Sequence, residues 1–542
     1  MRSLTPDELT RAVADRGLLP SETVERLKKE SRRRRVDVID LITAHGRFPS
    51  SAIYCAAAEV RGLSFIDYSR IRPNLDLAKA FPQSLLKRGA AIPVSQEGAK
   101  ITVACGSPDD HLLLSEIERR TGLHPLPALA EPNALKEAAN HLLSQINPSV
   151  QQTVEVDPVE ALDRIMKEAY LRRASDIHLD PQPDGMHTRI RVDGHLEEIR
   201  VHLQQHHSHA LVSRVKVLAG LDIAEQRSAQ DGGFTYDIPS LPDTSIDLRI
   251  ATIATKWGER VTIRILARDS KDITLNETGM NANALGLFKK ALQRPHGMIL
   301  ITGPTGSGKS TTLYASLREI RRPQVNIMTL EDPIESNIPG ISQVQVGGSD
   351  KITFAKGLRS MLRHDPDIIM VGEIRDQETA EVALRAAMTG HLIFSTLHTN
   401  DAASAVTRLM DIGCEPYLIA STLVAVVAQR LVRRLCEHCK TPRSPSDNER
   451  EQLGITDDST QVFGPSEHGC SRCSGTGFQG RIGVFELLWL DTELQRIVAD
   501  QCSQKEWNEA IATRRTELRE DGYQKIMDGK TTLEEVLGVA VS

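Results

Sequence analysis

Long apolar runs, aromatic side chains and net positive charge are all scarce in this sequence. No stretch approaches the roughly 20 apolar residues that cross a bilayer, and only 4% of the 542 residues are aromatic. The formal net charge of -6 provides no whole-protein attraction for nucleic acid. The first residues, MRSLTPDELT, are mostly polar and charged and lack the apolar segment of a secretory signal. These absences predict a cytoplasmic protein that reaches a membrane only through a partner.

The remaining composition is that of a soluble globular protein, with 40% hydrophobic and 25% charged residues. A chain of this length is expected to form about three to five domains. Four consecutive arginines, residues 32–35, form the main basic run. They are either a solvated helix surface or a docking patch for an acidic partner or an anionic lipid.

The first half of the chain is expected to form two domains joined by a linker. Residues 1–145 begin with helical spacing, and the later segment AKITVACGSPDD has the pattern of a strand that ends in a turn. Residues 146–157 lack a clear period and are predicted to be the linker. Residues 158–275 alternate strand and helix patterns and include two predicted hairpins, TRIRVDGHLEEIRV and SIDLRIATIATKWGERVTIRIL.

Residues 276–430 have a different pattern. Apolar runs alternate with helical stretches, the runs being GMILITG, VNIMTLED, DIIMVGE and HLIFSTLH. This alternation predicts an α/β fold, in which helices cover a parallel sheet. Residues 431–486 contain paired cysteines among many glycines, serines and prolines, and residues 487–542 are predicted to be helical.

A glycine-rich loop follows the first of those apolar runs. The segment GPTGSGKS fits the pattern G-x-x-x-x-G-K-[ST], with a strand pattern before it and a helical pattern after it. Glycines let consecutive N–H groups face one phosphate, and the helix adds its positive end. Lys309 is expected to reach the β- and γ-phosphates, and Ser310 to ligate Mg²⁺. The predicted nucleotide-binding residues are Gly303, Pro304, Thr305, Gly306, Ser307, Gly308, Lys309, Ser310 and Thr311.

Acidic residues follow two more of the apolar runs. Glu331 and Glu335 lie in TLEDPIE, and Glu373 follows IIMVG. Because ligands bind at the carboxyl ends of parallel strands, we expect all three carboxylates near the nucleotide. Glu373 is the predicted catalytic acid, since a carboxylate there can polarise the attacking water or order the Mg²⁺ shell. The alternative is that these carboxylates only cap strand ends in solvent.

Two histidines flank the apolar strand HLIFSTLH. His391 begins it and His398 ends it. The predicted role of His398 is to sense the γ-phosphate, and His391 is a second candidate catalytic residue. A purely structural histidine is the alternative in both cases.

Four of the eight cysteines form two C-x-x-C pairs. Cys436 and Cys439 make the first pair, and Cys470 and Cys473 make the second after 30 intervening residues. Two thiolates from each pair complete the tetrahedral four-cysteine set that Zn²⁺ prefers, and four protein ligands make the metal structural. A redox pair or an iron–sulfur cluster is the alternative, although no Rieske or ferredoxin spacing is present.

Several long motifs stand in a fixed order along the chain: SDIHLD, RIRVDG, DLRIAT, GPTGSGKST, LEDPIE, LRHDPDIIMVGEIRD, TGHLIFSTLHTNDA and the paired cysteines. In this order, over residues 158–542, they resemble the ATPases that power type II secretion and type IV pilus assembly. That family names its motifs Walker A, aspartate box, Walker B and histidine box. The paired cysteines favour an assembly ATPase over a pilus retraction ATPase.

The resemblance implies a homohexamer that hydrolyses ATP at subunit boundaries. It implies a RecA-like core over residues 276–430 and a PAS-like domain over residues 158–275. Arg249 and Arg264 match family positions that reach the γ-phosphate, the alternative being that each is an exposed strand arginine. The implied cofactors are ATP, Mg²⁺ and structural Zn²⁺. The implied partners are a cytoplasmic adaptor, bound by the recruitment domain at residues 1–145, and an inner-membrane platform protein.

The sequence departs from the family in two places. It reads AEQRSAQDGG where the family usually reads close to AERRLPQDGR, which puts in doubt any basic contact assigned there. The N-terminal domain also lacks the RLG start of the motif through which some recruitment domains bind cyclic di-GMP, and binding of that nucleotide stays open.

Two other functions compete with a secretion or pilus motor. A nucleic-acid-translocating motor would need a basic channel, and single strands would stimulate its ATPase. A nucleotide-gated scaffold would not hydrolyse ATP, and the intact Lys309, Ser310 and Glu373 argue against it. Whether the machine exports proteins or builds a pilus is left open by the sequence.

Overall fold

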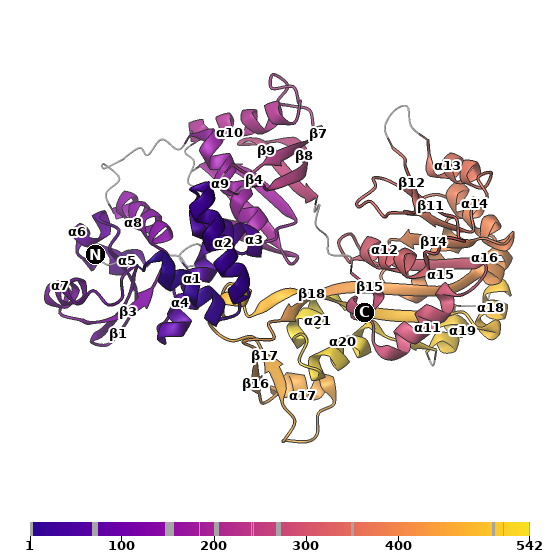
Figure 1. Cartoon of the computed structure of the whole chain (residues 1–542). Coiled ribbons are helices and arrows are strands. Elements are labelled where there is room, and N and C mark those ends of the chain that lie inside the picture. The colour runs from indigo at the N-terminus through magenta and orange to yellow at the C-terminus, as the bar shows by residue number, and fades with distance from the viewer. Residues whose placement is uncertain are drawn as a thin grey trace. The chain divides into compact units, whose positions relative to one another are not determined.

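The computed structural model describes most of the chain, and it divides into two compact units (Figure 1). The first unit comprises residues 1–268 with 436–440 and 465–479, and the second comprises 269–435, 441–464 and 480–542. The described residues are 4–67, 74–146, 157–183, 185–199, 205–239, 241, 243–266, 273–347, 352–500, 504–512 and 514–540. Most of the predicted linker at 146–157 lies outside them.

The first unit begins with a bundle of four helices. Its helix starts follow from capping signals: Thr5 forms a capping box with Glu8, and the Asp37 side chain accepts a hydrogen bond from the N–H of Ile39. Apolar side chains at helical spacing, such as Leu9 and Val13, form the bundle core. The helices are α1 (Pro6–Asp15), α2 (Ser21–Arg34), α3 (Val38–Gly46) and α4 (Ser50–Arg61).

A small three-stranded sheet with four helices follows in the same unit. The predicted strand in AKITVACGSPDD is present as the central strand of this sheet. The strands are β1 (Ala91–Glu97), β2 (Lys100–Cys105) and β3 (His124–Leu129), and the helices are α5 (Leu75–Ala80), α6 (Gln83–Lys87), α7 (His111–Thr121) and α8 (Pro132–Ile146).

A six-stranded antiparallel sheet, in the order β6-β5-β4-β9-β8-β7, forms the next layer of the first unit. Both predicted hairpins are confirmed, and the first turns at Asp193 and Gly194 with positive φ at both, as a two-residue hairpin turn requires. The elements are α9 (Pro158–Leu171), β4 (Asp176–Gln182), β5 (Gly185–Val192), β6 (His195–Ile199), α10 (Gln205–Leu218), β7 (Gln230–Asp237), β8 (Ser245–Thr255) and β9 (Gly258–Leu266).

The second unit is built on an eight-stranded sheet in the order β12-β11-β13-β14-β10-β15-β18-β19. The pairs from β12 through to β15 are parallel, which confirms the predicted parallel sheet, and β19 is antiparallel to β18. Alternate residues of β10 enter two different apolar clusters, Met298 and Leu300 one, Ile299 and Ile301 the other. Both faces of the sheet are therefore covered.

The strands of the second unit are β10 (Gly297–Thr302), β11 (Ile327–Glu331), β12 (Ser342–Gln345), β13 (Ile368–Val371), β14 (Leu392–Leu397), β15 (Leu423–Leu435), β16 (Thr441–Arg443), β17 (Val462–Gly464), β18 (Phe478–Trp489) and β19 (Arg515–Thr516). Its helices are α11 (Ala282–Leu292), α12 (Lys309–Ile320), α13 (Phe354–Met361), α14 (Gln377–Met388), α15 (Ala402–Asp411), α16 (Pro416–Thr422), α17 (Asp447–Leu453), α18 (Thr492–Ala499), α19 (Gln504–Ile511), α20 (Leu518–Met527) and α21 (Leu533–Val539). Among the described helices, none has the length and apolar content needed to cross a bilayer.

Candidate functional site

The glycine-rich loop connects the buried strand β10 to helix α12, whose first residue is Lys309. Gly303 and Gly308 have φ of +148° and +89°. A Cβ on Gly303 would lie 2.5 Å from the carbonyl oxygen of Gln429, and one on Gly308 would lie 2.7 Å from Gln429 Nε2. Neither position has room for a side chain, so the backbone of the loop passes close to β15.

The side chains of this loop fit a phosphate group. The Lys309 ammonium folds back over the loop and donates to the carbonyl oxygens of Gly303 at 2.8 Å and Pro304 at 3.0 Å. Burial lowers the pKa of Lys309, and the nearby Arg430 cation lowers it further. The hydroxyl of Ser307 is buried and has no hydrogen-bond partner in the described structure. A phosphate would supply the missing partner of Ser307 and a counter-charge for Lys309.

The two acids of TLEDPIE differ in their surroundings. Glu331, the last residue of β11, is buried, and its carboxylate accepts hydrogen bonds from Tyr314, Thr329 and Gln343. Glu335 is exposed in the following loop, and its charge acts on Lys309. Glu331 is therefore held in place by the protein, while Glu335 is free to face a ligand.

Glu373 follows β13 and lies against His398, which follows β14. The distance from His398 Nε2 to Glu373 Oε2 is 3.4 Å, and Glu373 also forms an ion pair with Arg375. The charge of Glu373 raises the pKa of Lys309, against the larger lowering effect of burial. The ends of the neighbouring parallel strands thus bring an acid, a histidine and the loop lysine to one edge of the sheet.

His391 lies at the opposite end of β14 from His398. Its Nδ1 is 2.9 Å from the carbonyl oxygen of Ala386, in the last turn of α14. The structure does not bring His391 to Glu373, and this contact suits a residue that satisfies a helix terminus. A catalytic role for His391 stays a prediction.

Two residues at this edge were not identified from the sequence. Gln429 Oε1 accepts a hydrogen bond of 2.8 Å from Thr312 Oγ1 in α12, and Arg430 Nη2 donates to the carbonyl oxygen of Asn400 at 2.6 Å. Both belong to β15, which pairs with β10, so they lie beside the glycine-rich loop. The available signal was an apolar run, VAVVA, that ends in Gln and Arg.

Arg249 and Arg264 belong to the first unit, on neighbouring strands of its six-stranded sheet. They are directly opposite each other in the β8–β9 pairing, and both are exposed. Arg264 Nε is 3.0 Å from Asp176 Oδ1, with 61% of its side chain accessible to solvent. Like charges at directly opposite positions are destabilising. The structure therefore places two positive charges opposite each other on an exposed face of the sheet.

The four cysteines of the C-x-x-C pairs come together in the first unit. All four sulfur atoms lie within 4.8 Å of one another. Cys473 Sγ also accepts hydrogen bonds from the N–H groups of Cys470 at 3.1 Å and Gly477 at 3.2 Å, a pattern that stabilises a thiolate. The donor set and its compactness fit one tetrahedral Zn²⁺ ion, with no ligand position left open.

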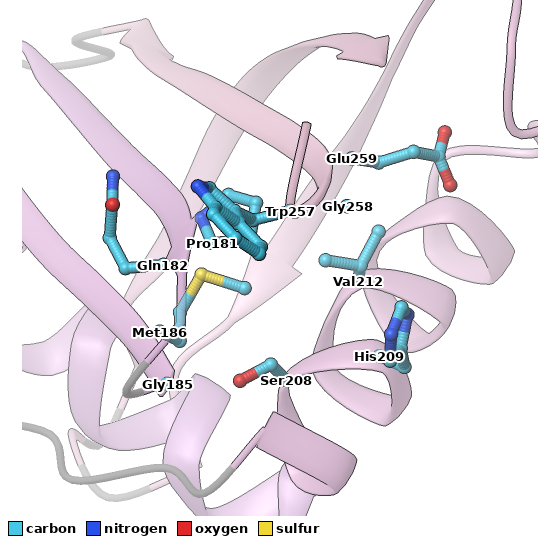
Figure 2. A pocket seen from close by; sticks show the side chains of 10 residues that line it. All are labelled: Pro181, Gln182, Gly185, Met186, Ser208, His209, Val212, Trp257, Gly258 and Glu259. Carbon is cyan, nitrogen blue, oxygen red and sulfur yellow. The ribbon is translucent and has the colours of Figure 1, made fainter. Parts of the chain in front are cut away.

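A small pocket, with an empty volume of about 260 Å³ that includes open solvent, lies in the first unit between β4, β5, α10 and the β8–β9 turn. Figure 2 shows the ring of Trp257 beside Pro181 and near Met186. Lys216, on α10, is buried and forms an ion pair of 2.8 Å with Glu259, one of the lining residues. The pocket is lined by Pro181, Gln182, Gly185, Met186, Ser208, His209, Val212, Trp257, Gly258 and Glu259, and none of these is a predicted site residue.

The chain matches two protein families. The family described as "Type II/IV secretion system protein" matches residues 152–538, and the MshEN domain family matches residues 61–147. The first match covers more than half of the chain.

Several curated proteins are similar to the chain. The type IV pilus assembly ATPase PilB of Thermus thermophilus is 38% identical over an alignment of 525 residues, and the match covers 92% of this chain but only 58% of that protein. PilB of Myxococcus xanthus is 34% identical over 552 residues, covering 96% of each chain. The type II secretion system ATPase E of Vibrio cholerae is 45% identical over 381 residues, covering 70% of this chain and 75% of that protein.

The fold also resembles a solved structure. The ATPase DotB of Legionella pneumophila superposes with a TM-score of 0.52 at 22% identity, covering 71% of this chain and 96% of that chain. At this level of identity the likeness shows a shared fold.

Proposed function

This chain belongs to the type II/IV secretion system protein family, as a secretion or pilus assembly ATPase, and from this we propose a cytoplasmic hexameric motor. It would hydrolyse ATP to ADP and phosphate at subunit boundaries. One observation carries the proposal: Lys309, Glu373 and His398 converge on a glycine-rich loop whose Ser307 hydroxyl lacks a partner in the described structure. A loop that only bound nucleotide would not need the acid and the histidine.

In the proposed reaction, a water molecule attacks the γ-phosphorus of ATP. The bond from that phosphorus to the β–γ bridging oxygen breaks, and Glu373 orients the water and accepts its proton. Lys309 and the loop N–H groups stabilise the charge on the β- and γ-phosphates, and Ser310 would ligate Mg²⁺, which neutralises phosphate charge. His398, 3.4 Å from Glu373, would report whether the γ-phosphate is present.

Other charged residues would assist. Glu335 is exposed and close enough to act on Lys309, so it suits the metal shell, while the buried Glu331 suits a supporting position. Arg249 and Arg264 would supply positive charge to the γ-phosphate from the first unit. Their exposure and their side-by-side placement support this role.

The remaining parts of the motor are proposed from the family. The second unit would be the RecA-like core, residues 158–275 a PAS-like domain, and residues 1–145 the part that docks on a cytoplasmic adaptor. The four-cysteine set would hold structural zinc. Hydrolysis would change the angle between the PAS-like domain and the core, and an inner-membrane platform protein would receive that motion.

The testing experiment is steady-state phosphate release with Mg-ATP over a range of protein concentrations. Release per chain that rises with concentration and disappears in Glu373→Gln supports an oligomerisation-dependent ATPase. Absence of release in the presence of both membrane-platform and adaptor proteins would contradict the proposal and favour a scaffold. Stimulation by single-stranded nucleic acid would instead favour a nucleic-acid motor.

A further inference from the structure

The second C-x-x-C pair contacts the N-terminal helical bundle, the four helices α1–α4. Ser471 stands between two predicted metal ligands, yet only 2% of it is accessible to solvent. Its backbone N–H donates to Glu59 Oε1 on α4 at 2.7 Å. A site with four cysteine ligands needs no fifth residue from outside its own loops, so this contact with a residue 412 positions earlier in the chain is not explained by metal binding alone.

Glu59 also ties this turn to the end of α1. Its other oxygen, Oε2, is 3.0 Å from Arg16 Nε, and Arg16 is the residue that ends α1. One carboxylate therefore joins two helices of the bundle to the cysteine turn. The bond from Ser471 to Glu59 is charge-assisted, which makes it stronger than a bond between neutral groups.

Arg472 makes a second link, independent of Glu59. Its Nη2 donates to the carbonyl oxygen of Arg16 at 3.2 Å, where α1 leaves carbonyl groups without helical partners. Its Nη1 donates to His438 Nε2 at 2.6 Å, between the two cysteines of the first pair. A Cβ on Gly17, which has φ of +62°, would lie 2.6 Å from Arg472 Nη2. The bundle thus presents a glycine where the guanidinium approaches.

The metal ligands determine the shape of the surface that makes these contacts. The turn from Cys470 to Cys473 closes on Cys473 Sγ through the N–H groups of Cys470 and Gly477. When all four sulfur atoms bind one ion, the N–H of Ser471 and the side chain of Arg472 are fixed in direction. When the ion is lost, four thiolates within 4.8 Å repel one another or take up protons, and the turn loses that constraint.

We propose that the paired cysteine turns are a docking site for the N-terminal helical bundle of the same chain, and that metal occupancy controls the docking. The occupant is the segment at residues 4–66. The metal centre would then do more than stabilise its own loops, because it would decide whether the bundle is held or released. This proposal does not depend on the ATPase activity.

Hydrogen exchange on the full-length, zinc-loaded protein tests the proposal. In Glu59→Ala and Arg472→Ala, the amides of the α1 end and of Ser471 should exchange roughly 10-fold faster or more, the factor expected from losing one charge-assisted hydrogen bond. Zinc content should stay at one ion per chain. Glu22→Ala, an exposed acid in the first turn of α2, is the matched control and should change neither region.

Removing zinc from the wild-type protein should produce the same increase in amide exchange rate. Removing it from Glu59→Ala should increase the exchange of α1 and α4 only a little more. Alkylation of Cys55, followed by mass spectrometry of its peptide, gives a second readout. Cys55 is buried one helical turn before Glu59 and donates a hydrogen bond to Glu59 Oε1 at 3.6 Å. The readout is therefore taken in metal-free wild type and in Arg472→Ala, which both keep Glu59, and Cys55 should react faster there after release. Glu59→Gln, which keeps an acceptor for Ser471, guards against a misfolded alanine variant and should show a smaller effect.

Unchanged exchange of α1 and α4 in metal-free wild-type protein would overturn the metal control. Unchanged exchange in both alanine variants, together with unchanged Cys55 reactivity in Arg472→Ala, would overturn the docking site itself.

Discussion

The two large sheets present their charged residues in different ways. The parallel sheet of the second unit gathers Lys309, Glu373 and His398 at one edge, each after a buried strand. The antiparallel sheet of the first unit presents Arg249 and Arg264 on an exposed face, in the middle of two strands. The loops at an edge of strand ends can enclose a ligand from several sides. The flat face of a strand pair can contact a ligand from one side only. In the proposed motor, the second unit would bind the nucleotide and activate water, and the first unit would deliver positive charge.

Substitution of Arg249 or Arg264 should cause the largest loss of ATP turnover if these side chains bring positive charge to the γ-phosphate. Arg249→Ala and Arg264→Ala are expected to lower ATP turnover by roughly 10³–10⁵-fold, the range known for arginines that act on a γ-phosphate. Nucleotide binding should largely survive, because the loop that holds the phosphates lies in the second unit. Turnover and nucleotide binding are measured separately.

Arg189→Ala is the matched control for the arginines. Arg189 lies in the same sheet on β5, where it pairs with Asp180. Its loss should leave turnover nearly unchanged. Wild-type turnover in both test variants would remove the functional distinction between the two sheets.

Glu373→Gln tests the edge of the second-unit sheet at which its parallel strands end. The amide keeps the size of the side chain but cannot accept a proton, so turnover should fall by roughly 10²–10⁴-fold. ATP affinity should not weaken, and binding is measured by equilibrium titration. Glu378→Gln, an exposed acid in the first turn of the nearby α14, is the control. Equal losses in the two variants would mean that general surface charge, rather than proton transfer, matters at this edge.

Metal removal tests the segment between β15 and β18, residues 436–477, which contains the four cysteines and lies outside both large sheets. Zinc contributes roughly 10–16 kcal/mol of folding free energy to small model modules. This segment should therefore become sensitive to protease in chelator, while the second-unit sheet stays resistant. Fragments are identified by mass spectrometry, and re-addition of Zn²⁺ should restore resistance. Equal protease resistance with and without metal would show that the cysteines are not needed for local folding.

The smallest expected effect is a pH dependence in the first unit. Burial, together with the nearby charges of Glu168, Asp67 and Glu137, raises the pKa of Glu131 to about 7, and the hydrogen bond that Ser50 donates to it acts in the opposite direction. Between the unfolded value near 4.5 and the folded value, the native state holds a proton that the unfolded chain has lost. This contribution to stability therefore declines as pH rises through that window.

Glu131→Gln should remove this decline. The Tm of the variant relative to wild type should increase between pH 5 and pH 8, by about 2–4 °C for each kcal/mol recovered. Thermal unfolding at several pH values measures it, with Glu97→Gln, an exposed acid at the end of β1, as control. A constant difference in Tm across that range would show that Glu131 is ionised in the folded protein throughout.

The sequence was most informative where function follows a buried strand. The apolar runs before Lys309 and Glu373 predicted both the strands and the edge at which they end, and the structure has these strands. Gln429 and Arg430 could not be predicted as site residues from the sequence. Their proximity to the glycine-rich loop depends on the pairing of β15 with β10, a contact between residues far apart in sequence. The buried pair of Lys216 and Glu259 was missed for the same reason.

Histidines show the limit of reasoning from strand ends. His391 and His398 flank one strand in the sequence, and both were candidate catalytic residues, with His398 favoured as the γ-phosphate sensor. Strand direction separates them, because only the carboxyl end of β14 reaches Glu373. The contact between Glu59 and Ser471 could not be predicted from the sequence, because Ser471 fills an unspecified position of its C-x-x-C pair and Glu59 belongs to no recognisable motif.

The positions of the cysteines also bear on loop-closure entropy. Strand β15 ends at Leu435 and its neighbour β18 begins at Phe478, so the cysteine pairs follow one strand and precede the other. A cross-link between the pairs spans 30 residues, and closing a loop of that size restricts the unfolded chain by about 3–4 kcal/mol. Each doubling of the loop changes this by only about 0.6 kcal/mol. The exposed turn at residues 456–459 is therefore where a tag or an inserted domain should disturb the paired strands least.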